Sequence, residues 1–234
     1  MKLLDTGIKL GAESGEDAMV STASLESRLV ALRDQRRDTI AQLTDAKLTR
    51  LALDEAGILI ELERGDEAWS ITRPLFDSLI KRKQWEEAAE ACQLMFLSGE
   101  EDALAALGQG VWLAVTFPID PELSLSMLQH IIEETPDNSD GAAVAAATAA
   151  YIVDLRCEGK QHNDLQFFSM QMLGNVARRH SNIEDQSQFN SWIARLELDD
   201  PAKFLVRLRN VVDVLAQDLW WFDRDLVQQE LPVH

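Results

Sequence analysis

Apolar residues recur at intervals of three or four along most of the chain, and short polar turns separate the successive runs. This period is that of an amphipathic α-helix, and no stretch shows the strict alternation of a half-buried β-strand. The pattern predicts helices over residues 67–83, 84–97, 102–116, 121–134, 141–156 and 165–179, with a short helix around Trp192. Residues 25–51 fit either one long helix or two stacked helices. The sequence therefore predicts an all-α fold.

The two ends of the chain differ in pattern. Residues 1–20 mix Gly, Ser and acids without a period, which predicts a loose N-terminal leader, and residues 21–234 then form a single all-helical domain. At the other end, Pro201 begins a run in which apolar residues alternate steps of four and three: Phe204, Leu208, Val211, Leu215, Leu219, Phe222 and Leu226. This stripe predicts a long amphipathic C-terminal helix within a helical cap that covers residues 163–234.

The charge of the chain narrows the choice of partner. It has 22 basic and 40 acidic residues, a formal net charge of -18, which disfavours nucleic acid and anionic membranes and favours a basic partner segment. The first residues do not resemble a signal peptide or an anchor, and no run is long enough to cross a membrane, so we expect a cytoplasmic protein. Cys92 and Cys157 lie in predicted helices without metal-site spacing, and we expect buried free thiols.

A short stretch, QWEEAAEACQL, carries a family resemblance. Trp85, Glu86, Glu87 and Ala88, with Cys92 at the next small position, resemble the second helix of a tetratricopeptide repeat (TPR). A second copy follows 36 residues later at residues 120–124, and Pro136 stands where a proline closes the repeat. The resemblance covers roughly residues 67–157. It implies a right-handed array of antiparallel helical hairpins, and a second register that starts near Gly57 fits almost as well.

The same resemblance implies that the first helix of each pair lines a groove for a peptide or a partner helix. The positions that face the groove would be Ser70, Arg73, Asp77 and Lys81 on one helix and Ala106, Gln109, Leu113 and Thr116 on the next. Arg73 and Lys81 could receive an acidic segment or a terminal carboxylate, although a solvated helix face reads the same way. Our partner-binding candidates in this groove are Arg73, Asp77, Lys81 and Gln109.

Two consecutive tryptophans near the C-terminus need a separate explanation. Trp221 falls away from the apolar stripe if the last helix continues, so a second surface must receive it. Trp220 and Trp221 either pack on the body of the chain or form an exposed patch for a partner or for a homodimer. Trp85 and Trp192 are isolated at helical spacing, and we expect them to anchor the core.

Few residues in the sequence suggest catalysis. His130 with Glu133 and Glu134 would place one imidazole beside a carboxylate on one helix, but no second ligand motif, nucleophile motif or phosphate-binding loop accompanies it. We therefore expect no catalytic residue, no metal and no cofactor. The leading hypothesis is a non-catalytic protein-protein interaction module, an adaptor or an assembly chaperone. The alternative is a metal- or cofactor-binding helical-bundle enzyme that uses His130 and the neighbouring acids.

Overall fold

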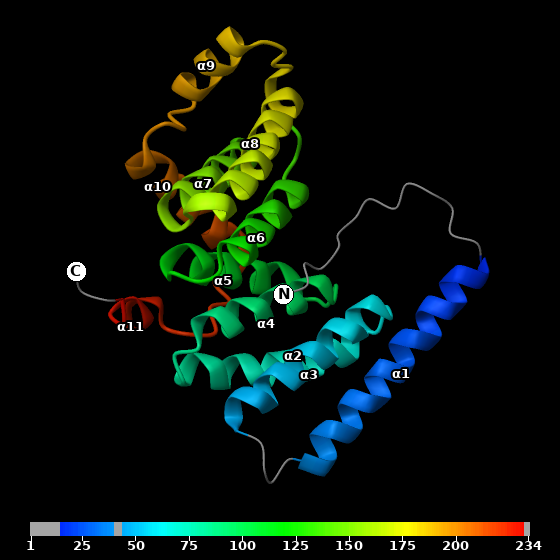
Figure 1. Ribbon diagram of the computed structural model, residues 1–234. Helices are drawn as coiled ribbons and strands as arrows, with labels where there is room; N and C mark the ends of the chain where they lie inside the picture. Colours follow the sequence, from blue (N-terminus) through cyan, green and yellow to red (C-terminus); the bar gives the residue numbers. More distant parts are fainter. Residues whose placement is uncertain (1–14, 40–43, 232–234) are drawn as a thin grey trace.

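The computed structural model describes residues 15–39 and 44–231, and this part of the chain is built from helices without a strand (Figure 1). This confirms the predicted all-α class. None of the described helices combines the length and the apolar character needed to cross a membrane. The helices are α1 (Gly15–Thr39), α2 (Asp45–Glu61), α3 (Gly65–Lys81), α4 (Trp85–Leu97), α5 (Ala103–Thr116), α6 (Pro121–Glu134), α7 (Asp140–Arg156), α8 (Gly159–Ser181), α9 (Gln186–Arg195), α10 (Pro201–Ala216) and α11 (Arg224–Gln228).

The helices agree with the sequence pattern in most places, and the differences lie mainly toward the two ends of the chain. Residues 25–51 belong to two helices, α1 and α2, which is one of the two arrangements expected from their pattern. Helix α1 begins at Gly15, inside the stretch expected to be a leader, and the rest of that stretch lies outside the described residues. Residues 159–164, expected to be a loop, form the first turns of α8. These turns are mostly exposed, so they lack the apolar period by which a helix is recognised.

The turns between the early helices share one backbone geometry. Glu63, Lys83 and Gly99 each follow a helix end in the left-handed conformation, with φ of 59°, 58° and 71°. In the first two turns the next N–H donates back to a helix carbonyl, from Arg64 to Leu59 at 2.8 Å and from Gln84 to Leu79 at 3.0 Å. These bonds satisfy carbonyls that the helix end leaves unpaired, and the chain enters the next helix after three residues in the first two turns and after five in the third.

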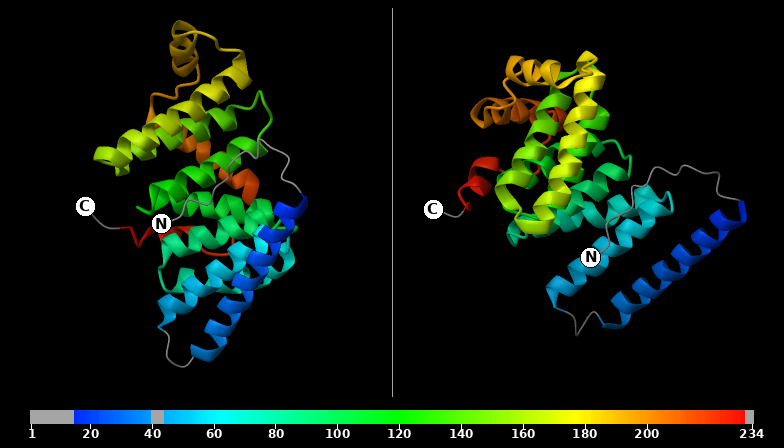
Figure 2. Two further views of the ribbon diagram at one scale, coloured as in Figure 1. Left: turned by 45° about the vertical axis from the view of Figure 1, so that its right-hand side comes forward. Right: turned by 45° about the horizontal axis from the view of Figure 1, so that its top comes forward.

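Each helix from α2 to α8 packs on its neighbour in sequence, and contacts between α2 and α4 and between α6 and α8 join alternate helices. Helix α7 is rich in alanine and almost wholly buried, as its composition predicts, because small side chains allow close approach on every face. Helix α1 lies at the outer edge beside α2, whereas α8 and α9 lie at the other end of the molecule (Figures 1 and 2). Helix α10 returns to pack on both α5 and α7.

The prediction of a long C-terminal helix is wrong. Helix α10 ends at Ala216, because Gln217 and Asp218 both adopt the left-handed conformation, with φ of 47° and 65°. Residues 219–223 are not helical, and the short helix α11 follows. The apolar stripe is therefore divided between α10, which buries Phe204 and Leu208, and a separate segment that contains Leu219 and Phe222. This break determines how the C-terminal residues meet α3 and α5.

Candidate functional site

Residues 217–223, here called the strap, lie across α3 and α5, and Trp221 is their main contact. Its ring meets Trp69 and Phe76 of α3 edge-on, with centroid distances of 6.0 Å and 5.6 Å. The guanidinium of Arg73 lies over the same ring at 4.1 Å from its centroid. Edge-to-face aromatic pairs and a cation over an indole are both attractive arrangements. Trp221 thus packs on the body of the chain, one of the two outcomes expected from its position in the sequence.

Gln109 of α5 holds the backbone of the strap. Its Oε1 accepts a hydrogen bond from the N–H of Trp221 at 2.9 Å, and its Nε2 donates to the carbonyl of Leu219 at 3.3 Å. A further bond from Nε2 to the carbonyl of Ala105 anchors the amide to its own helix at 3.2 Å. The side chain is 0% exposed, so every polar atom must find a partner inside the protein. In this conformation Gln109 is not accessible to a partner protein.

Trp220 turns to the other side of the strap, toward α5 and α11. Its ring lies edge-on to Trp112 at 6.3 Å, and the guanidinium of Arg224 lies over it at 4.0 Å. Arg224 in turn donates to Asp213 of α10 at 2.6 Å. Successive tryptophans of the strap are therefore received by different helices, and the strap joins α3, α5 and α10.

The structure brings four of the six partner-binding candidates into one contact set: Arg73, Gln109, Trp220 and Trp221. They contact the protein's own strap and its surroundings, so a role toward a partner stays a prediction. Asp77 forms an ion pair with Arg73 at 2.7 Å, and Lys81 is exposed at the end of α3. Of the other groove positions, Ala106 and Leu113 are buried in the core. The strap contacts Arg73 and Gln109 of the predicted groove face, and a groove that binds a partner stays a prediction.

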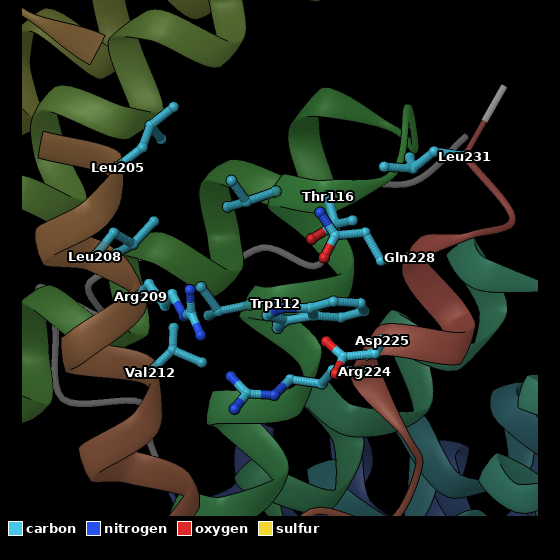
Figure 3. Close-up of a pocket in the computed structure, with 12 residues that line it drawn as sticks. Trp112, Thr116, Leu205, Leu208, Arg209, Val212, Arg224, Asp225, Gln228 and Leu231 are labelled. Carbon is cyan, nitrogen blue, oxygen red and sulfur yellow. The ribbon is translucent and has the colours of Figure 1, made fainter. Parts of the chain in front are cut away.

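A cavity of about 430 Å³ adjoins the strap, between α5, α10 and α11 (Figure 3). Sequence reasoning did not identify this cavity, because it forms only where the chain turns back after Ala216. Its walls are mainly apolar, and polar side chains stand at its mouth. The lining residues on α5 are Val111, Trp112, Val115 and Thr116, those on α10 are Leu205, Leu208, Arg209 and Val212, and those at the C-terminal end are Arg224, Asp225, Gln228 and Leu231.

The charged groups at the mouth of this pocket differ in whether they form ion pairs. The guanidinium groups of Arg209 and Arg224 reach the same carboxylate, that of Asp213, at 3.9 Å and 2.6 Å. The carboxylate of Asp225 also lines the pocket, and this residue is exposed. Among the described residues no ion pair to Asp225 is found. The two guanidinium groups and the two carboxylates balance in charge at the mouth, and within the described part of the chain Asp225 is the one of the four that makes no ion pair.

His130, the centre of the alternative hypothesis, lies in a different part of the molecule, on α6. It is 8% exposed, its Nε2 lies 3.3 Å from the amide of Gln93, and its Nδ1 lies 3.5 Å from Glu133. Burial lowers the pKa of His130 below its usual value, and Glu133 opposes this shift in part. Among the described residues, no three His, Cys, Asp or Glu side chains are placed to hold a metal ion together.

The remaining sequence predictions concern the core. Cys92 and Cys157 are free and buried, as expected, and burial raises the pKa of both thiols. Trp192 is buried and donates from Nε1 to His180 at 3.2 Å, while the ring of Trp85 stacks on Phe117 with a centroid distance of 4.5 Å. Both tryptophans therefore serve to pack helices.

Comparison with known proteins gives no assignment. No family model matches the chain, and neither the curated proteins nor the solved structures contain a significant match. The residues of the strap and of the pocket must therefore carry the functional argument.

Proposed function

We propose that this chain is a non-catalytic protein-interaction module, an adaptor or assembly chaperone, built on a TPR-like array of antiparallel helical hairpins. The observation that carries the proposal is the pocket between α5, α10 and α11. Packed helices that follow one another through short turns support the array, and two buried free thiols fit a reducing compartment such as the cytoplasm.

The pocket has the size and lining of a site that takes an apolar group. Its volume of about 430 Å³ lies within the range of ligand sites in proteins. Aliphatic side chains of α5 and α10 and the indole of Trp112 form its walls, so an apolar side chain that enters it exchanges water for apolar surface on the sides that face these helices. Interfaces concentrate their binding energy in such pockets, where one large side chain of the partner is fully desolvated.

The negative charge of the chain and of Asp225 indicates the charge expected of the partner segment. The whole chain carries a net charge of -18, and Asp225 at the mouth of the pocket makes no ion pair among the described residues. A cationic side chain next to the buried group would approach faster in this field and would pair with Asp225. We therefore propose that the partner segment presents a large apolar residue beside a lysine or an arginine.

A photo-cross-linking residue placed at Leu205 or at Val206 tests this proposal in the native cell extract. The two positions are neighbours on α10, but Leu205 lines the pocket whereas Val206 is 60% exposed on another side. We expect position 205 alone to cross-link one partner protein, through a segment of the proposed chemistry. Leu205→Trp, which fills the pocket, should abolish that product, and Val206→Trp should leave it. Equal cross-linking from both positions would refute the pocket as the docking site.

A further inference from the structure

The strap is held in the way that a groove holds a foreign peptide. Two of its backbone groups, the N–H of Trp221 and the carbonyl of Leu219, bond to one buried amide, that of Gln109. These bonds use backbone groups of the strap, so they do not depend on the identity of its side chains. Backbone bonds of this kind, together with a slot for one side chain, are how helical and β-sheet grooves recognise extended segments.

The slot for the side chain selects an aromatic residue. Trp69 and Phe76 present ring edges and faces to Trp221, and Arg73 covers the indole from above. Asp77 holds the guanidinium of Arg73 through an ion pair at 2.7 Å. An indole satisfies the ring contacts and the cation together, and an aliphatic side chain would lose the attraction to the cation.

The strap is attached to the rest of the chain by a strained hinge. Gln217 and Asp218 both have positive φ, a conformation that side chains other than glycine rarely adopt. Both are exposed, and so is most of α11 beyond the strap. Release of the strap would relax this hinge and would leave α3, α5 and α10 as complete helices. The local structure therefore favours an exchangeable segment over a permanent part of the core.

We propose that the α3/α5 face under the strap is a second docking site, for an extended segment of a partner protein that carries a tryptophan flanked by basic residues. The strap occupies this site as a built-in ligand until such a segment replaces it. Because α11 follows the strap, replacement also withdraws α11 from the pocket. The α3/α5 face and the pocket are thus alternatives, each available in one state of the strap.

Charge decides between a basic partner segment and the strap of a second copy. The strap carries Asp218 and Asp223, whose carboxylates make no ion pair with α3 or α5. Asp223 caps α11 by accepting from the N–H groups of Asp225 and Leu226, but on a second copy the same acids would enter the field of a chain with a net charge of -18. A partner segment with lysines at the positions of Asp218 and Asp223 would keep the aromatic contacts and would be attracted by the negative charge of the chain. The partner is therefore a basic aromatic segment.

Three labelled peptides test this proposal: Lys-Leu-Trp-Trp-Phe-Lys, Lys-Leu-Trp-Ala-Phe-Lys and Asp-Leu-Trp-Trp-Phe-Asp. Fluorescence anisotropy measures their binding to the wild type, to Trp221→Ala, and to a full-length chain with six Gly or Ser residues inserted between Gln217 and Asp218. The insertion keeps the contacts of the strap with α3 and α5, although it gives up the bond from the N–H of Leu219 to the carbonyl of Ala216, and it lowers the effective concentration of the strap at the site. If Trp221→Ala fails to fold, the insertion variant alone provides the chain with a released strap.

We expect the first peptide to bind both variants at least tenfold more tightly than it binds the wild type. The alanine peptide should bind at least tenfold more weakly than the first. The acidic peptide should be weaker than the first at low salt, with a difference that shrinks as salt rises. Adding Gln109→Ala to either variant should remove the binding, whereas Leu205→Trp should not, which separates this site from the pocket.

Equal binding of the tryptophan and alanine peptides, or no binding to a folded variant, would overturn the proposal. The remaining possible occupant is the strap of a second copy. Measurement of the molecular mass at several protein concentrations tests for it. A wild-type dimer that disappears in Trp221→Ala would show that a second copy supplies the strap, and it would refute the basic partner segment.

Discussion

Two stretches of α5, one turn apart, face the C-terminal residues, and they differ in how far those residues cover them. Around Gln109 the helix is covered by the strap, and no accessible surface of this side chain is left. Around Trp112 and Val115 the same helix lines an open pocket, although the ring of Trp112 also meets Trp220 and Phe222 of the strap. The covered stretch offers the strap a buried amide beside the ring slot of α3, and the open stretch offers mainly aliphatic walls. Directional contacts on α5, more than apolar area, thus determine where the chain closes on itself.

The largest expected effect on stability comes from removing the indole ring of Trp221, which holds the strap over the covered stretch of α5. Trp221→Ala deletes the contacts with Trp69, Phe76 and Arg73 and should lower the free energy of unfolding by about 3 kcal/mol, near the low end for large aromatic residues because the indole is only half-buried. Urea denaturation measures this change. Val214→Ala, at a position that is 73% exposed on α10, should change the stability by less than about 0.5 kcal/mol. Equal effects of the two variants would show that the strap is not docked in solution.

The second test concerns the amide under the strap. Gln109→Leu keeps the volume of the side chain but leaves the N–H of Trp221 and the carbonyl of Leu219 without partners, at a cost of about 2 kcal/mol. Gln228→Leu makes the same change at the mouth of the pocket, where the side chain is exposed, and should be nearly neutral. A neutral Gln109→Leu would mean that packing of the rings alone holds the strap.

The third test moves α10 relative to α5. A Cβ at Gly108 would lie 3.1 Å from both the carbonyl oxygen of Val212 and the N of Ala216, which are backbone atoms that can yield only if α10 shifts. Gly108→Ala should therefore destabilise the protein by about 1 to 2 kcal/mol, as other overpacked sites do. At Gly174 of α8 the nearest atom is the end of Arg178 at 3.8 Å, so Gly174→Ala should stabilise by about 0.5 kcal/mol through helix propensity. Thermal unfolding of the two variants should shift in opposite directions.

The comparison also explains which features were predictable from sequence. The starts of α6 and α10 follow from Asp120 with Pro121 and from Asp200 with Pro201, because a cap and a first-turn proline act locally. The end of α10 was missed because Leu219 and Phe222 continue the helical period by coincidence, while their partners lie more than a hundred residues away along the chain, as Gln109 does. The pocket was missed for the same reason, since it exists only where this long-range contact redirects the chain.

The smallest expected effect is the dependence of stability on pH. It distinguishes the contribution of the strap from that of the core around His130. Burial lowers the pKa of His130 in the folded state, so the unfolded chain takes up its proton first as the pH falls. Stability should therefore be fully present above the usual histidine pKa of about 6.5 and should decline as the pH falls through the lowered folded pKa. The contacts of the strap with Trp69, Phe76 and the amide of Gln109 involve no titratable group.

Urea midpoints at pH 7.5 and 5.5 for the wild type, His130→Gln and Trp221→Ala test this assignment. The difference between the two pH values should shrink in His130→Gln, because the buried imidazole is gone and the glutamine can still meet the amide of Gln93. It should persist in Trp221→Ala, since that variant changes only the strap and its contacts. A pH difference that disappears in Trp221→Ala would instead link the proton to strap docking. The covered stretch of α5 would then open by a change of charge rather than by competition from a partner segment.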